Sequence, residues 1–387
     1  MAGLVPLAIG KPGVAKTSVL IALARALNRK LYILTGSIRE PADVGGYPTL
    51  HEIVLGDGNT VVCMKIVPPE YVVRALSEPH ILFIDELTCC HPQTQSAMLA
   101  IAAERRVGDT YLPDDLLIFA ACNPPGTAAN GYPLEATMAN RLLHFIWEFP
   151  REQWLAGMRD GLKFPDPEVP VLPSDWDKHI IGVSTMMAEF HERVPGFLEP
   201  EEDDAGEIKL TPAQRSGAYP TPRTWDIAAR GIAAAKSIDA PLEVQEEIAR
   251  AAVGYEASEA YFEYTDSLDL PDPNTVIEKV EELIATKQAL SAIHKVLDEE
   301  TEDLKRPDKV RAFLGSINAS VSMDNTLPRW TAAQEIFRHS VLVHKEVSLV
   351  CAGPLYRNKP EKAVISPDMV EVIWQTIGRT LDEKGDA

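Results

Sequence analysis

The stretch AIGKPGVAKTSVLIALARAL, residues 8–27, decides the fold class because it joins a glycine-containing loop to an alanine-rich helical pattern. In such a loop, successive backbone N–H groups converge on anionic oxygens at the start of a helix, and the helix dipole adds to the attraction. Lys16 would contact the β and γ phosphates of a nucleotide, and the Thr17 hydroxyl would ligate Mg²⁺. The residues that we expect around the phosphates are Gly10, Lys11, Pro12, Gly13, Val14, Ala15, Lys16, Thr17 and Ser18.

Ala15 is the unusual residue of this loop, because it stands where a third glycine is common. We expect right-handed helical dihedrals at this position. The methyl group of alanine should then cost little.

Two further strand ends carry polar side chains that suit phosphate chemistry. The segment HILFIDE, residues 80–86, delivers Asp85 and Glu86 to the carboxyl edge of a sheet, where ligand sites of open α/β sheets lie. Asp85 would hold Mg²⁺ through water, and Glu86 would polarise the attacking water. Asn123 ends the segment LLIFAACN and would orient water near a γ-phosphate, although a strand-terminal asparagine before prolines is also an ordinary turn former.

Two arginines complete the pattern. Arg141 precedes an apolar strand in LEATMANRLLHF, and Arg223 opens a helical segment in YPTPRTW. A guanidinium group stabilises the charge that spreads over a transferring phosphoryl group. Each arginine taken alone could equally lie on the surface without a role.

Apolar runs that alternate with helical patterns predict an α/β fold with a parallel sheet covered on both faces. One segment, 40–76, breaks the alternation and reads as an inserted β-hairpin around GDGN. The five expected strands lie within 4–9, 30–36, 80–86, 116–123 and 144–149.

The chain length predicts more than one domain. We expect a nucleotide-binding αβα core at 1–150, an all-helical lid at 151–270 and a helical C-terminal extension at 271–387. Apolar residues spaced by three and four over 276–297 predict one amphipathic helix within this extension.

Composition limits the partners and the compartment. The formal charge of −20 disfavours binding to nucleic acid, because a negative surface repels phosphate backbones. No apolar run approaches the roughly 20 residues of a membrane helix. The five cysteines form no regular framework, which is typical of a reducing compartment. We therefore expect a cytoplasmic protein.

With these elements in order, the chain resembles an AAA+ ATPase, and more narrowly the MoxR branch near the dynein-related group. The resemblance covers about residues 3–265. The segments that carry it are GKPGVAKT, SIREPADVGGYP, FIDELTCCHPQTQSAML, AACNPP, MANRLLHF and YPTPRTW.

The resemblance implies a role for each candidate residue. Lys16 and Thr17 belong to Walker A, and Asp85 and Glu86 belong to Walker B. Asn123 corresponds to sensor 1. Arg141 corresponds to a finger that acts on a neighbouring subunit, and Arg223 to sensor 2 in the lid. Members of the family form hexameric rings and remodel proteins, often with partners that contain a von Willebrand factor A domain.

The leading hypothesis is an ATP- and Mg²⁺-dependent motor that remodels or activates a client protein in the manner of a chaperone. A second hypothesis is a nucleotide-switched assembly scaffold with little turnover. A third, a nucleic-acid motor, is disfavoured by the acidic charge.

Overall fold

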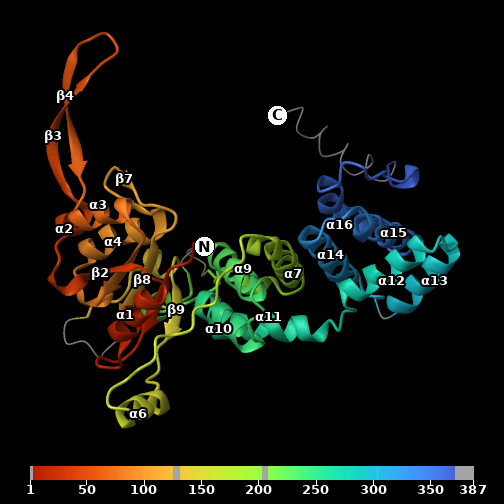
Figure 1. Cartoon of the computed structure of the whole chain (residues 1–387), viewed down its shortest axis with the longest axis horizontal. Coiled ribbons are helices and arrows are strands. Elements are labelled where there is room, and N and C mark those ends of the chain that lie inside the picture. Colours follow the sequence, from red (N-terminus) through yellow and green to blue (C-terminus); the bar gives the residue numbers. More distant parts are fainter. Residues whose placement is uncertain (1–2, 125–130, 203–207, 303, 371–387) are drawn as a thin grey trace. The chain divides into compact units, whose positions relative to one another are not determined.

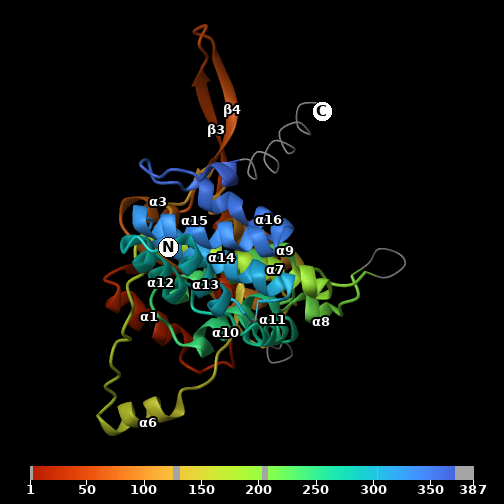
Figure 2. The same ribbon diagram turned by 90° about the vertical axis from the view of Figure 1, so that its right-hand side faces the viewer.

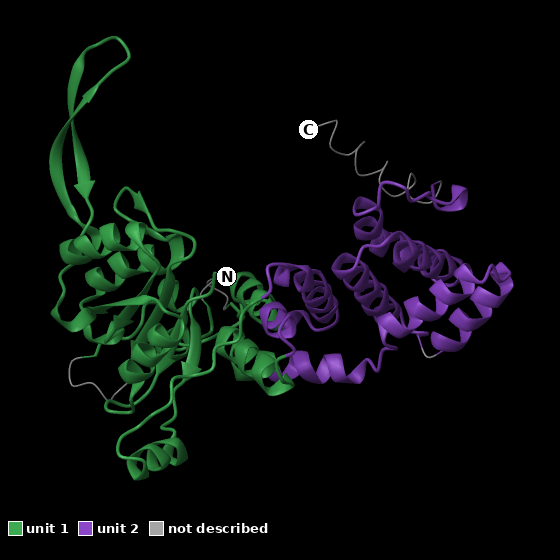
Figure 3. Ribbon diagram, viewed as in Figure 1, with its two compact units in different colours: residues 1–172, 197–231, 240–258 green, residues 173–196, 232–239, 259–387 purple. Residues whose placement is uncertain are grey.

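The computed structural model describes residues 3–124, 131–202, 208–302 and 304–370. The chain divides into two compact units (Figure 3). Unit 1 contains residues 1–172, 197–231 and 240–258, and unit 2 contains residues 173–196, 232–239 and 259–387.

Unit 1 is built on a five-stranded sheet in the order β2-β5-β8-β1-β9, and all of its pairings are parallel. The predicted α/β fold with a five-stranded parallel sheet is therefore confirmed. The strands are β1 (Pro6–Ile9), β2 (Lys30–Thr35), β5 (His80–Asp85), β8 (Leu117–Cys122) and β9 (Leu143–Ile146).

Different helices cover the two faces of this sheet. Successive side chains of a strand point to opposite faces, so each face has its own apolar contacts. Leu82 and Ile84 of β5 pack in one cluster with α3 (Glu70–Ser77) and α4 (Pro92–Glu104). Phe83 lies on the opposite side and packs with α1 (Lys16–Ala26). Burial on both faces explains why β5 is apolar along most of its length.

Unit 1 contains a long β-hairpin between β2 and α3, as the sequence predicts. It consists of β3 (Tyr47–Val54) and β4 (Thr60–Val67), which pair antiparallel from Tyr47 opposite Val67 to Val54 opposite Thr60. Figures 1 and 2 show the ribbon extending away from the sheet in both views. Near its base, the backbone N–H of Ile66 donates to Asp109 Oδ2 at 3.2 Å, which connects the hairpin to the turn between β6 and β7.

The other elements of unit 1 are α2 (Pro41–Gly45), β6 (Arg106–Val107), β7 (Thr110–Tyr111), α5 (Ala136–Ala139), α6 (Arg151–Arg159), α8 (Pro212–Arg215), α10 (Leu242–Val253) and the 3₁₀ turns Gly36–Ile38 and Leu87–Cys89. The 3₁₀ turn Pro195–Phe197 begins in residues of unit 2 and ends at the first residue of the next segment of unit 1.

Helices from the expected lid segment fall in both units. Two of them, α9 (Pro222–Lys236) and α11 (Tyr255–Ser267), begin in unit 1 and continue in unit 2. The boundaries of the lid, 151–270, therefore stay a prediction.

Unit 2 is helical over its described residues. Large buried side chains such as Trp330, Phe313 and Phe337 fill its core. Its elements are the 3₁₀ turn Trp176–His179, α7 (Ile180–Arg193), α12 (Pro273–Ala285), α13 (Leu290–Glu300), α14 (Pro307–Met323), α15 (Leu327–Val343) and α16 (Lys345–Arg357).

The single helix expected over 276–297 is wrong, because α12 ends and α13 begins within it. Lys287 has a φ of 52°. The N–H of Gln288 reaches the carbonyl of Leu283, and the N–H of Lys287 reaches the carbonyl of Ile284. This pair of bonds is a Schellman motif, which ends a helix at a left-handed residue. The apolar spacing continues across the break, so periodicity alone does not reveal it.

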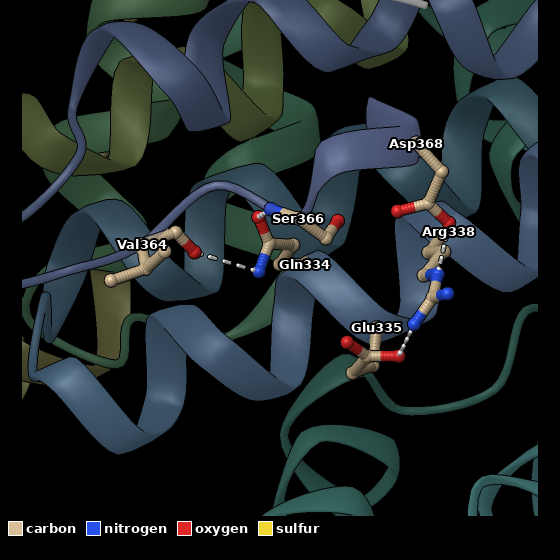
Figure 4. A network of polar contacts seen from close by, with 6 residues as sticks. All are labelled: Gln334, Glu335, Arg338, Val364, Ser366 and Asp368. Atoms are coloured by element: carbon tan, nitrogen blue, oxygen red, sulfur yellow. Dashed lines mark hydrogen bonds and ion pairs between the residues drawn. The ribbon is translucent and has the colours of Figure 1, made fainter. Parts of the chain in front are cut away.

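Polar contacts hold the segment after α16 against α15 (Figure 4). The side-chain amide of Gln334 donates to the carbonyl of Val364 and accepts from the N–H of Ser366, at 3.2 and 3.1 Å. Arg338 forms ion pairs with Glu335 and Asp368. Gln334 is buried, so these backbone partners satisfy an amide that would otherwise be costly to bury.

No helix among the described residues is both long and apolar enough to cross a lipid bilayer.

The contact between α7 and α14 generates a stability prediction, because it depends on a glycine. A Cβ on Gly315 would overlap Cγ2 of Thr185, whose hydroxyl donates to the carbonyl of Ile181 at 2.7 Å. We expect Gly315→Ala to lower the stability of unit 2 by about 1–2 kcal/mol, because the steric cost exceeds the gain in helix propensity.

Hydrogen exchange of peptides from α7 and α14 measures this effect. Ser316→Ala, at the next position of the same helix, is the control and should change stability by less than about 0.5 kcal/mol. Equal exchange rates in the Gly315→Ala and Ser316→Ala variants would show that the helices do not pack closely at this glycine.

Candidate nucleotide-binding site

The carboxyl ends of three neighbouring strands converge on one cavity. β5, β8 and β1 are adjacent and parallel, so the residues that follow them meet at the same edge of the sheet. The cavity measures about 210 Å³. The residues that line it are Pro12, Gly13, Val14, Ala15, Lys16, Thr17, Asp85, Glu86, Cys122 and Asn123.

Most of the residues predicted from the sequence are therefore brought together. Gly10 lies beside the cavity, and its N–H donates to the carbonyl of Cys122 at 3.2 Å. Lys11 and Ser18 are exposed and are not among the lining residues of the cavity. The two arginines lie elsewhere, as described below.

Lys16 places its ammonium group inside the loop. Its Nζ donates to the carbonyls of Gly10 and Lys11, at 2.5 and 3.1 Å, and to Oδ1 of Asn123 at 3.2 Å. The residue is buried, and burial lowers the pKa of Lys16, while the nearby Asp85 carboxylate acts in the opposite direction. Phosphate oxygens, which carry full charge, would be stronger partners for this ammonium than the neutral oxygens that it now contacts.

Thr17 and Asp85 meet directly across the cavity, 68 positions apart in the chain. The Thr17 hydroxyl donates to Oδ2 of Asp85 at 3.1 Å. A hydroxyl and a carboxylate are hard oxygen donors of the kind that Mg²⁺ prefers, and Mg²⁺ normally takes one or two protein ligands and completes its shell with phosphate and water. Thr17 and Asp85 thus fit a magnesium ion, which would neutralise charge on bound phosphates. Clusters of three or more His, Cys, Asp or Glu suited to a metal do not occur in the described part of the chain.

Glu86 is held in an unusual backbone conformation at the start of this cavity. Its φ is 57°, and its N–H donates to Oδ1 of Asp85 at 2.9 Å. The carboxylate of Glu86 accepts a hydrogen bond from the hydroxyl of Ser37. Left-handed residues other than glycine cost free energy and concentrate at functional sites.

Ser37 was not anticipated from the sequence. It follows β2, the strand that pairs with β5 up to Thr35 opposite Asp85. A polar residue that follows an apolar strand can indicate a functional site in the sequence. It points to this particular cavity only once the structure shows that β2 lies beside β5.

Ala15 overturns the expectation of right-handed dihedrals. Its φ is 66° and its ψ is 20°, and Gly13 in the same loop has a φ of 79°. Left-handed residues alternate with right-handed ones where backbone N–H groups turn inward to form an anion-binding concavity. The position therefore favours glycine, and alanine is strained there.

Trp147, the residue after the edge strand β9, supports the loop and was also not anticipated. Its indole Nε1–H donates to the carbonyl of Val14 at 3.0 Å. A Cβ on Gly10 would lie 2.9 Å from the Cβ and the carbonyl oxygen of Trp147. Glycine at position 10 is thus required by close approach.

Arg141 and Arg223 do not line the cavity. Arg141 is half-buried and donates to the carbonyl of Thr137 at 2.5 Å, whereas Arg223 is exposed near the start of α9. The structure therefore assembles Lys16, Thr17, Asp85, Glu86 and Asn123, but not the arginines.

The strain at Ala15 leads to a second prediction. Ala15→Gly should raise stability by up to about 1 kcal/mol, because relief of the left-handed penalty exceeds the added freedom of the unfolded chain. Ala22→Gly makes the same exchange within α1 and should lower stability by about 1 kcal/mol. Chemical denaturation, together with hydrogen exchange of peptides from 8–27, measures the stability of both variants. An equal loss of stability in the two variants would mean that Ala15 has helical dihedrals like Ala22.

The comparisons with known proteins identify this part of the chain. Residues 7–135 match the family model of the AAA domain (dynein-related subfamily). No curated protein matches the chain significantly. A solved structure named "putative ATPase" from Cytophaga hutchinsonii is similar, with 18% sequence identity and a TM-score of 0.38, over 65% of this chain and 77% of that chain. The family match spans the phosphate loop, Asp85, Glu86 and Asn123. The match therefore identifies residues 7–135 as an AAA domain of the dynein-related subfamily.

Proposed function

We propose that the chain hydrolyses ATP with the aid of Mg²⁺ and uses the reaction to remodel or activate a partner protein, as the MoxR-like branch does. The observation that carries the ATPase part is the direct hydrogen bond between Thr17 and Asp85. It brings the phosphate loop and the acidic strand end within reach of one metal-bound triphosphate.

Each residue of the cavity has a distinct task in this proposal. Lys16 binds the β and γ phosphates, and Thr17 and Asp85 hold the metal ion. Glu86 accepts a proton from the water that attacks the γ-phosphorus, and Asn123 orients that water. The bond from the γ-phosphorus to its bridging oxygen breaks, which releases ADP and phosphate.

The complete site requires a second copy of the chain. Arg141 lies outside the cavity, so it serves the site of a neighbour in a homo-oligomeric ring. Six subunits are the number that the resemblance suggests. A guanidinium supplied from a neighbour stabilises the charge of the transferring phosphoryl group.

The partner would be a protein that covers the β3–β4 hairpin. In the antiparallel register Leu50 lies opposite Met64, and these side chains are 82% and 71% exposed. Val54 and Val62 are exposed on the same face, since residues two and four apart share a face. A two-stranded ribbon is marginal in water, and clustered exposed apolar side chains mark interaction surfaces. A client with a von Willebrand factor A domain remains one candidate for this partner.

We propose a cytoplasmic location, because a reducing compartment keeps cysteines as free thiols. All five, Cys63, Cys89, Cys90, Cys122 and Cys351, are free thiols. Burial raises the pKa of the Cys122 thiol to about 12, so this residue at the cavity is an inert neutral group at physiological pH.

Glu86→Gln tests the hydrolysis. This variant should bind ATP but turn over at least about 100-fold more slowly, because general base catalysis is lost. Lys16→Ala is the matched control, and it should lose ATP-dependent thermal stabilisation. Steady-state phosphate release at saturating ATP measures turnover. Wild-type release at background would favour the nucleotide-switched scaffold, and undiminished release by Glu86→Gln would contradict its role.

The hairpin is tested in the Glu86→Gln background, where ATP stays bound. Proteins that co-purify with this variant should be lost when Leu50→Ser and Met64→Ser are added, because the apolar contact is removed. Thr49→Ala with Lys65→Ala, a paired exchange on the other face, should retain them. Mass spectrometry of the purified complexes measures this, and unchanged capture by the serine variant would exclude the hairpin.

A further inference from the structure

A cavity of about 350 Å³ lies between α13, α14 and α15, within unit 2 (Figure 3). The residues that line it come from these three helices, from the chain between α13 and α14, and from His344 at the end of α15. They are separate from the residues that line the nucleotide-binding site. We call this space the α13–α15 cavity.

The wall of the α13–α15 cavity contains apolar side chains from the core of unit 2. Apolar surface that faces a cavity lacks the dispersion contacts of a packed core, and an apolar ligand restores them. A cavity of about 150 Å³ is enough for benzene, so the α13–α15 cavity has room for a fused pair of rings. The apolar residues of the wall, each at most 3% exposed, are Leu297, Leu304, Val310, Phe313 and Ile336.

His339 is a buried polar residue of this wall, and it is 7% exposed. Its Nε2 lies 3.2 Å from Oδ1 of Asp298, and the ring of His294 packs against it with centroids 5.1 Å apart. Burial lowers the pKa of His339, while the Asp298 carboxylate acts in the opposite direction, so the imidazole is neutral at physiological pH. A carboxylate only accepts hydrogen bonds, so the proton is on Nε2 and Nδ1 is an acceptor. Nδ1 has no hydrogen-bond partner among the described residues, and a donor would remove the cost of its burial.

Two hydroxyl groups that line the cavity are also acceptors. The Thr301 hydroxyl donates to the carbonyl of Leu297 at 2.7 Å. The Ser348 hydroxyl donates to the carbonyl of His344 at 2.8 Å, and the Ser340 hydroxyl lies 2.7 Å from it. Because each hydroxyl has a single proton, Ser340 must donate to Ser348. Thr301 and Ser340 can therefore only accept a hydrogen bond from a bound group.

The cavity opens to solvent, because Asp298, Glu302, Lys305 and Val343 line it and are also exposed. Two carboxylates against one ammonium group give this opening a net negative charge, which disfavours anions such as phosphates and carboxylates. A cation would leave water at a high cost when it enters an apolar wall. The chemistry that fits the cavity is therefore that of an uncharged ligand with a hydrogen-bond donor.

We propose that the α13–α15 cavity is a binding site for an uncharged aromatic group that carries an N–H donor, such as an indole ring. The apolar wall buries the rings, Phe313 and His339 offer ring surfaces from α14 and α15, and Nδ1 of His339 accepts the N–H. The group belongs either to a tryptophan side chain of a protein partner or to a free small molecule. Neither source requires ATP hydrolysis, so the inference goes beyond the proposed function.

Two small molecules test the site on the full-length protein without any variant. Indole and benzofuran have nearly the same size and shape, but benzofuran has an oxygen where indole has its N–H. Indole should bind at a single site per chain and at least about 5-fold more tightly than benzofuran, since only indole can donate to His339. Calorimetric titration measures both affinities, and hydrogen exchange of peptides from 336–344 should slow with indole. Indole that shows no saturable binding, or equal affinities for the two molecules, would overturn the proposal.

His339→Phe assigns the hydrogen bond to this residue. The variant keeps a ring in the wall but removes the acceptor, so the preference for indole over benzofuran should disappear. His179→Phe makes the same exchange at a residue of unit 2 that does not line the cavity, and it should keep the preference. A preference that survives in His339→Phe would place the indole elsewhere and would also overturn the proposal.

N-acetyltryptophanamide identifies the source of the aromatic group, because it carries the backbone of a tryptophan residue on the same rings. Displacement of indole by this compound would identify a protein side chain as the ligand, since the opening beside Val343 must then accommodate a polypeptide. Binding of indole without binding of N-acetyltryptophanamide would identify a free small molecule. Either result supports the site, and the comparison of indole with benzofuran decides whether the site exists.

Discussion

The parallel pairing of β1, β5 and β8 is the constraint on which the site depends. It places the residues after three strands at one edge, so that Thr17 reaches Asp85 and Lys16 reaches Asn123 through hydrogen bonds. These residues are far apart in the sequence, so without that pairing their side chains would not meet in space and would form no site. The remaining features support it: Trp147 braces the loop, and Ser37 holds the carboxylate of Glu86.

Much of this arrangement could be predicted from the sequence. Apolar runs with helices between them indicated the parallel sheet, and carboxylates or amides at the ends of those runs indicated the cavity. The hairpin was also visible, because GDGN separates two β-rich segments. These signals are local, or follow from the general rule that parallel strands present their carboxyl ends together.

The features that were missed depend on tertiary structure. Ala15 is left-handed because the loop must turn its N–H groups inward, and a propensity argument does not contain that requirement. Ser37 and Trp147 matter only because β2 and β9 neighbour other strands in a particular order. A hydrogen bond between Thr221 and Asn140, which are 81 positions apart, joins the segments that carry Arg223 and Arg141, and no local pattern reveals it. The break after α12 shows that apolar spacing can continue through a helix end.

The central claim is that Thr17 and Asp85 share one metal-bound triphosphate. Calorimetric titration of ATP with and without Mg²⁺, for the wild type, Thr17→Ala, Asp85→Ala and the double variant, tests it most directly. Mg²⁺ should strengthen ATP binding to the wild type, each single variant should lose most of that gain, and the double variant should lose little more, since both residues act on one ion. A gain from Mg²⁺ that survives in both single variants, or losses that simply add, would contradict the claim.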